Sequence, residues 1–200
     1  MRELLLATGN KGKIPGLIAG LGDVPFKILT LNEVKIPEGL EVEEPGSTYE
    51  AHAAIKAFVY SKHTGYMSLA DDSGLEIDAL KGEPGVHTAH YFSGTRDERV
   101  EAMLEKLKDI PVGARQGRYR CVIAIYDPKN DKIRFAEGVT EGVITTEAKG
   151  TNGFGYDPIF QPEGFDKTFG ELALEEVLEI SHRGRALAKA REILMREFAV

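Results

Sequence analysis

Cysteine is nearly missing from this sequence, and so are long hydrophobic runs. The single cysteine, Cys121, cannot form a disulfide within the chain, which excludes a disulfide scaffold. The N-terminus shows no long apolar segment followed by a small-residue cleavage site, so we expect a reducing, cytoplasmic location. No apolar run approaches the length of a membrane span, and we therefore expect no membrane binding.

Positive charge is also scarce. The 25 Lys and Arg residues are outnumbered by 32 Asp and Glu residues, giving a formal net charge of -7. Non-specific nucleic-acid binding needs many basic contacts that release counterions, so we expect no nucleic-acid polymer as partner. A small anion can still bind where a few cations converge. The chain has no repeat or long flexible linker, and 42% of its 200 residues are hydrophobic, which predicts one domain over residues 1–200.

Short apolar runs alternate with helical patterns along the chain, which favours an α/β fold. The runs at 118–126 and 132–139 flank a turn-forming segment and predict a long antiparallel hairpin. A hairpin in addition to a strand–turn–helix start favours a mixed sheet over a purely parallel one. The predicted strands cover residues 4–7, 26–31, 67–70, 75–80, 118–126 and 132–139.

Capping residues mark the starts of three predicted helices. Ser47 with Glu50 and Thr95 with Glu98 match the capping box, in which the first residue and the acid three positions later satisfy each other's free amides. Ser181 is a suitable N-cap for a C-terminal helix with an apolar stripe over 186–194.

The first candidate site is the turn after the first strand. Free backbone amides and a Lys ammonium at such a strand-to-helix turn can hold phosphate oxygens. The spacing differs from a Walker loop, since Gly12 follows Gly9 too closely and Ile14 replaces the metal-binding hydroxyl. An ordinary polar turn is the alternative. The candidate residues are Thr8, Gly9, Asn10, Lys11, Gly12 and Lys13.

The second candidate site is the pair of acids Asp71 and Asp72, which precede Ser73 after a predicted strand. Neighbouring side chains of an extended segment point to opposite sides, so one acid is expected to face the site. Mg²⁺ commonly takes one or two carboxylates together with waters and substrate phosphate oxygens. A second acid could come from Glu41, Glu43 or Glu44. The alternative is a solvated turn.

The third candidate site combines glycines, aromatic residues and an acid over residues 150–158. The aromatic faces and the carboxylate could clamp a flat base by stacking and a hydrogen bond. A glycine-rich turn with its aromatic side chains in the core is the alternative. The candidate residues are Phe154, Gly155, Tyr156 and Asp157.

Cations near two predicted helices complete the candidates. His182 and Arg183 lie in the first turn of the C-terminal helix, where the macrodipole disfavours positive charge and a bound anion would offset the cost. The alternative is that they are solvated or paired with acids such as Glu179. Lys56 lies in a helix one turn after His52, as a surface charge or as a phosphate ligand.

Taken together, these segments resemble the non-canonical purine nucleoside triphosphate pyrophosphatase family, also called the ITPase, Ham1 or RdgB-like family. The resemblance covers nearly the whole chain and keeps the order of several long motifs. It is carried by Thr8-Gly9-Asn10 with Lys13; Glu44 with 47–50 and Lys56; 69–80; Gly85-Val86 with Ala89; 153–160; Thr168-Phe169 with Glu171-Leu172; and 180–187.

The resemblance implies an elongated, two-lobed mixed-sheet α/β fold with a central cleft, and a homodimer. It implies that Asp72 is the general base and a Mg²⁺ ligand, with Glu44 as its partner acid. The other implied roles are triphosphate binding by Asn10, Lys13 and Lys56, with Ser73 beside the metal; a base pocket of Phe154, Tyr156 and Asp157; and recognition of the purine 6-oxo edge by His182 and Arg183.

The implied activity is Mg²⁺-dependent hydrolysis of ITP, dITP and XTP to the monophosphate and pyrophosphate. The chain departs from the family pattern at Gly16, at His52, where an Asn is usual, and at Val177, where a Lys is common. These departures leave two alternatives: a nucleotide-binding protein of the same fold with weak or lost turnover, and a house-cleaning pyrophosphatase for modified pyrimidine nucleotides.

Overall fold

The structure, a computed structural model, describes residues 1–37, 40, 42, 43 and 46–198, and the chain divides into two compact units. Unit 1 comprises Met1–Asp72, Cys121–Gly138 and Arg185–Val200, and unit 2 comprises Ser73–Arg120 and Val139–Gly184. Three strands, β3 (Met67–Ile77), β4 (Gln116–Asp127) and β5 (Lys132–Ile144), have residues in both units.

The strands form one mixed sheet in the order β2-β1-β3-β4-β5-β6. Strand β1 (Arg2–Leu6) runs parallel to β2 (Phe26–Thr30) and to β3, whereas β5 runs antiparallel to β6 (Phe160–Pro162). Strands β4 and β5 are neighbours joined by residues 128–131, too short a connection for a parallel pair. The predicted mixed α/β sheet and its hairpin are therefore confirmed.

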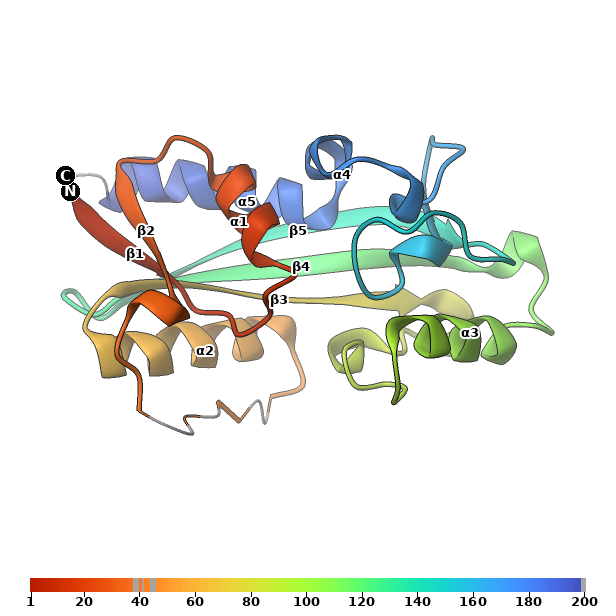
Figure 1. Cartoon of the computed structure of the whole chain (residues 1–200), viewed down its shortest axis with the longest axis horizontal. Helices are drawn as coiled ribbons and strands as arrows, with labels where there is room; N and C mark the ends of the chain where they lie inside the picture. Colours follow the sequence, from red (N-terminus) through yellow and green to blue (C-terminus); the bar gives the residue numbers. More distant parts are fainter. Residues whose placement is uncertain (38–39, 41, 44–45, 199–200) are drawn as a thin grey trace. The chain divides into compact units, whose positions relative to one another are not determined.

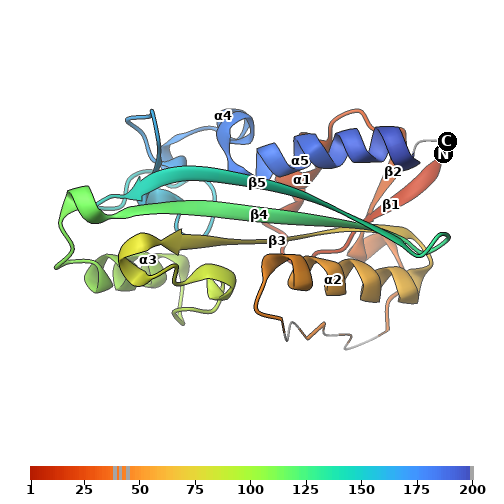
Figure 2. The ribbon, with the colours of Figure 1, turned by 180° about the vertical axis from the view of Figure 1, so that it is seen from behind.

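Unit 1 packs helices on both sides of its strands. Figures 1 and 2 show α2 (Tyr49–Thr64) on one side of β1 and β3, and α1 (Ile14–Leu21) and α5 (His182–Ile193) on the other. A π-helical turn, Leu194–Phe198, continues α5. Strand β1 is buried from Leu4 to Leu6 because it has strands on both edges and helices over both faces, which explains its uninterrupted apolar run.

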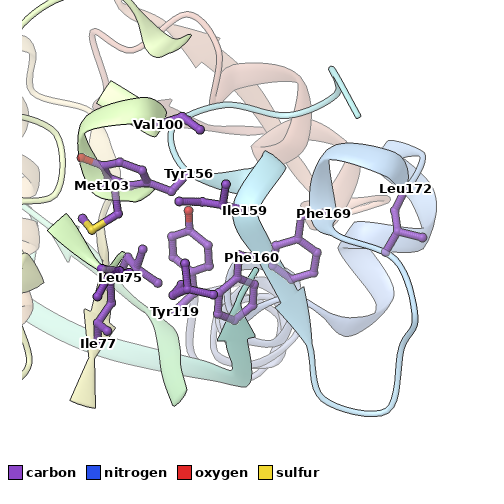
Figure 3. Packing of buried hydrophobic residues seen from close by; sticks show 12 residues of the cluster. Leu75, Ile77, Val100, Met103, Tyr119, Tyr156, Ile159, Phe160, Phe169 and Leu172 are labelled. Carbon is purple, nitrogen blue, oxygen red and sulfur yellow. The ribbon is translucent and has the colours of Figure 1, made fainter. Parts of the chain in front are cut away.

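Unit 2 has its own hydrophobic core, shown in Figure 3. Helix α3 (Arg96–Lys106) contributes Val100 and Met103, and strand β3 contributes Leu75 and Ile77. The aromatic members of this core are Tyr119, Tyr156, Phe160 and Phe169. Helix α4 (Leu174–Ile180), which we did not predict, packs Val177 and Ile180 against this core. Short 3-10 helices occupy Leu31–Glu33, Asp78–Leu80, Gly85–His87, Val112–Ala114, Asp157–Ile159 and Phe169–Glu171.

Two of the three predicted helix caps are confirmed. The Thr95–Glu98 capping box starts α3, and the Ser181 Oγ accepts a hydrogen bond from the Gly184 amide at the start of α5. The box of Ser47 and Glu50 is wrong. Helix α2 begins one residue later than that box requires, so Thr48 is the N-cap and accepts from the Ala51 amide at 3.2 Å.

The break predicted between residues 70 and 75 is also wrong. Strand β3 continues from Met67 to Ile77, and Asp71 and Asp72 lie inside it with 2% and 8% of their surface exposed. Acids can stay in a buried strand when cations pair with them, as both acids do here. Within the described part of the chain, no helix has the length and apolar character needed to cross a bilayer.

Candidate active site

The turn between β1 and α1 is shaped by the Asn10 side chain. Its Oδ1 accepts a hydrogen bond from the Gly12 amide at 3.0 Å, and its carbonyl accepts from the Lys13 amide at 3.1 Å. Lys13 is the N-cap of α1, and no side chain caps this helix start. Backbone amides at an uncapped helix N-terminus are suited to anionic oxygens, so the geometry agrees with the predicted phosphate site.

Unit 1 places two lysines against the two acids of β3. Lys13 Nζ lies 2.8 Å from Asp71 Oδ2, and Lys56 Nζ, from α2, lies 2.8 Å from Asp72 Oδ1. We call these four residues the lysine–aspartate cluster. Because adjacent strand residues point to opposite faces, Asp71 meets the start of α1 and Asp72 meets α2. The two acids therefore point to opposite faces of the strand, and Lys56 is not a mere surface charge. That only one of the acids faces the site stays a prediction.

His52 is a further neighbour of Asp72. Its Nδ1 lies 3.3 Å from Asp72 Oδ2, and its Nε2 lies 2.7 Å from the Gly46 carbonyl oxygen. Since a carbonyl oxygen only accepts, Nε2 carries a proton and donates. A Cβ at Gly46 would lie 2.6 Å from the Ala51 Cβ and 3.2 Å from the His52 ring. Glycine is therefore required for this close approach of the backbone to the imidazole.

The acids of β3 fit a hard, oxygen-binding cation. Asp72 keeps 11% of its side chain exposed, whereas the Asp71 side chain is fully buried. Mg²⁺ needs as few as one or two protein carboxylates when phosphate oxygens and waters complete its shell. The second predicted acid, Glu44, lies outside the described residues, and the described residues contain no cluster of three His, Cys, Asp or Glu side chains suited to a metal.

In unit 2, Arg96 at the start of α3 holds the glycine-rich segment 150–158. Its Nη1 donates to the Thr151 carbonyl at 3.0 Å and its Nη2 to the Asn152 carbonyl at 2.7 Å. Sequence reasoning missed this role, because Arg96 lies between the capping residues Thr95 and Glu98 and has no signal of its own.

The same segment presents the Asp157 carboxylate. Asp157 Oδ2 accepts from the Phe154 amide at 2.8 Å, and a Cβ on Gly153, whose φ is +68°, would lie 2.1 Å from that oxygen. Burial raises the pKa of Asp157 to about 6, while the Phe154 amide, Arg183, Arg96 and Tyr119 oppose the rise. This carboxyl group can thus change its charge close to neutral pH.

His182 and Arg183 are not solvated, because 4% and 8% of their surface is exposed. The His182 ring stacks on Tyr119, with ring centroids 4.6 Å apart and an interplanar angle of 11°. Arg183 lies over the Phe154 ring at 4.9 Å, and its Nη2 donates to the Ser73 Oγ at 3.0 Å. Unit 2 therefore brings together most of its predicted site residues.

The Tyr156 side chain lies in the hydrophobic core of unit 2. It is 2% exposed and belongs to the hydrophobic core, near Val100, Met103 and Ile159 in Figure 3. The placement agrees with the alternative in which an aromatic side chain of this segment fills the core. A role for Tyr156 in base binding stays a prediction, as do the roles of Gly155 and the exposed residues Gly9 and Lys11.

The chain is similar to known proteins over nearly its whole length. The sequence model of the Ham1 family matches residues 4–193. A dITP/XTP pyrophosphatase of Desulforamulus reducens is 46% identical over 196 residues, covering 97% of this chain and 96% of the relative. A solved structure of a HAM1 protein from Coxiella burnetii superposes with a TM-score of 0.87 and 39% identity over 98% of this chain and 99% of that one. The Staphylococcus aureus Ham1 protein gives a TM-score of 0.85 and 34% identity over 98% of this chain and 100% of that one.

Proposed function

The chain belongs to the Ham1 family, and we propose that it hydrolyses non-canonical purine nucleoside triphosphates, namely ITP, dITP and XTP, to the monophosphate and pyrophosphate. The observation that carries the proposal is the Lys56–Asp72 pair. It places an acid and an ammonium 2.8 Å apart in unit 1, which also holds the turn over residues 8–13. Relatives named dITP/XTP pyrophosphatase support the choice of substrate.

The reaction breaks one phosphoanhydride bond. A water oxygen forms a bond to the α-phosphorus, the bond from that phosphorus to the bridging oxygen breaks, and pyrophosphate leaves with the bridging oxygen. Asp72 accepts the proton from the attacking water. Lys13, Lys56 and the amides before α1 bind the phosphate oxygens and stabilise the charge that develops on them.

We propose Mg²⁺ as the cofactor, held by Asp72 with Glu44 as the predicted second acid. When bound, Mg²⁺ neutralises phosphate charge and so favours in-line attack. Lys56 and Asp72 already form an ion pair, so Lys56 would turn from the carboxylate to phosphate oxygens when the substrate enters. A lysine has four flexible side-chain bonds and can make this change without backbone movement.

The groups of unit 2 would recognise the base. His182 and Arg183 are donors and suit the 6-oxo oxygen of hypoxanthine or xanthine, while Phe154 offers an aromatic face. An adenine amino group would place a donor against these donors. The exocyclic group at position 6 is therefore the expected basis of discrimination against ATP.

The predicted homodimer and cytoplasmic location stay predictions. Light scattering of the purified chain would test the first, and fractionation of the producing cells the second.

The test is pyrophosphate release from ITP, XTP, dITP, ATP, GTP and dUTP by the purified protein, with Mg²⁺ and with a chelator. We expect rapid, metal-dependent release from the first three. Nucleotide binding without release would favour a protein that has lost turnover, and a preference for dUTP would favour a pyrimidine substrate. Full activity in the chelator would contradict only the Mg²⁺ assignment and would leave the proposed reaction standing.

A further inference from the structure

We propose that His52 is the positioning residue of Asp72: it holds one carboxylate oxygen in place and leaves the other to accept the proton of the attacking water. The inference rests on the proposed function and deepens it, because it names the oxygen of Asp72 that reacts. In the sequence, His52 was only a departure from the family pattern, one helical turn before Lys56.

Helix α2 presents two side chains to the two oxygens of Asp72. His52 and Lys56 are four residues apart in this helix, so they lie on one face of it. Lys56 Nζ lies 2.8 Å from Asp72 Oδ1, and His52 Nδ1 lies 3.3 Å from Asp72 Oδ2. The last torsion of an aspartate side chain has a broad energy profile, so a carboxylate without neighbours turns easily. Partners at both oxygens therefore restrict its orientation.

The imidazole is the less mobile of the two partners. His52 is 4% exposed, and its Nε2 donates to the Gly46 carbonyl oxygen at 2.7 Å. The Gly46 backbone also packs close to the ring, since a Cβ at this glycine would lie 3.2 Å from the His52 Cδ2. The long, flexible side chain of a lysine is held by nothing comparable. Lys56 can therefore leave Asp72 for phosphate oxygens while His52 stays.

This asymmetry gives each oxygen of Asp72 its own task. When Lys56 turns to the phosphate, Oδ1 becomes available to the attacking water, whereas Oδ2 keeps the imidazole beside it. A carboxylate fixed in this way needs no reorientation before it accepts the proton, and correct orientation of a reacting group lowers the barrier. His52 touches neither water nor phosphate in this scheme and acts only through Asp72.

The decisive variants are His52→Asn and His52→Gln, which both replace the ring by an amide. The amide nitrogen of Asn is as many bonds from the main chain as Nδ1 and can keep the contact with Asp72. That of Gln corresponds to Nε2 and can keep only the contact with Gly46. We expect kcat for ITP to fall about tenfold in His52→Gln with KM unchanged, because the carboxylate loses its fixed orientation. In His52→Asn it should stay within about threefold of the unmodified protein.

His63→Gln is the matched control. His63 lies on the same helix, and its Nδ1 lies 2.9 Å from the Val59 carbonyl oxygen, not from a carboxylate. We expect its kinetic constants to equal those of the unmodified protein. A fall in kcat as large as that in His52→Gln would show that the loss comes from disturbing α2, and would contradict the positioning role.

Crystal structures of the two His52 variants give a readout that does not depend on turnover. We expect the Asp72 carboxylate to keep its orientation in His52→Asn and to turn in His52→Gln. If the unmodified protein hydrolyses ITP and the two variants have equal kcat, the role of His52 is wrong and the proposed function stands. If the unmodified protein releases no pyrophosphate from ITP, the proposed function is wrong. A carboxylate turned only in His52→Gln would then still support the positioning role, and the same orientation in both variants would overturn it.

Discussion

The lysine–aspartate cluster of unit 1 and the base-site groups of unit 2 are built from different interactions. In unit 1, lysine ammonium groups meet carboxylates at 2.8 Å. In unit 2, the His182 ring stacks on Tyr119, and the Asp157 carboxylate accepts a hydrogen bond from the Phe154 backbone amide. The first set is adaptable because lysine side chains are flexible, and the second is fixed because rings and backbone are not.

This difference suggests that the groups of unit 1 and those of unit 2 have different tasks in the reaction. Charge changes during the reaction occur on phosphate and water, so the groups that respond to them should be able to exchange partners. Base recognition requires no exchange, and fixed groups discriminate better because they cannot adjust to a wrong base. Changes in unit 1 should therefore act mainly on kcat, and changes in unit 2 mainly on KM and selectivity.

Asp72→Asn should have the largest effect. The amide keeps the shape of the side chain but loses the proton acceptor and the charge, so we expect kcat to fall about a thousandfold. Pyrophosphate release measures this change, and tight binding of inosine monophosphate should persist. Turnover within a few-fold of the unmodified protein would show that Asp72 is not the base.

Lys56→Met and Lys13→Met divide the cluster further. We expect Lys56→Met to lower kcat about a hundredfold, because an ammonium aimed at developing charge is lost. Lys13→Met should cause the larger fall in thermal stability, since its partner Asp71 has a fully buried side chain and Asp72 does not. Calorimetry of both variants tests the ranking, and the reverse order would contradict the burial argument.

Asp157→Asn should remove the pH dependence of base recognition. In the unmodified protein kcat/KM for ITP should rise as pH passes through about 6, where Asp157 ionises, and the variant should be flat there. Selectivity for ITP over ATP should fall about tenfold. An unchanged rise would assign it to another group.

The stability of the folded protein should fall over the pH range in which kcat/KM rises. The folded-state pKa of Asp157 is raised above its ordinary 3.8, so the protonated form is favoured in the folded protein. Its contribution to stability is complete below about pH 3.8 and is lost as pH rises through about 6. As pH rises across that window, the unmodified protein should lose unfolding free energy relative to Asp157→Asn, which has no carboxyl group to ionise.

Local patterns were sufficient for most of the fold. Apolar runs located β1, β2 and the β4–β5 hairpin to within a few residues, because burial between helices demands continuous apolar side chains. They failed at Asp71 and Asp72, where the local sequence suggests a turn. The strand continues there because Lys13 and Lys56 supply charges from distant parts of the chain, and no local pattern contains that information.

The candidate site was predictable only in part, again because local patterns do not contain the contacts between distant residues. Motifs identified the residues that would touch phosphate or base, and the structure groups Lys13 with Asp71, Lys56 with Asp72, and Arg183 with Ser73 and Phe154. The supporting residues carry no such signal. Tyr119 resembles any buried strand residue, and its stack on His182 depends on which rings the fold places beside it.

Arg96→Met should have the smallest effect and tests whether the unit 2 segment needs support from α3. Loss of the guanidinium removes the donors to the Thr151 and Asn152 carbonyls, which should loosen the segment that presents Asp157. We expect KM for ITP to rise about fivefold with little change in kcat, because both hydrogen bonds are exposed to solvent and neither touches the substrate. Arg99→Met, which removes a donor to the Ala89 carbonyl from the same helix, is the matched control. Equal KM values in the two variants would mean that the segment holds its shape without α3, and that the rigidity of the base site comes from the rings and from Asp157 alone.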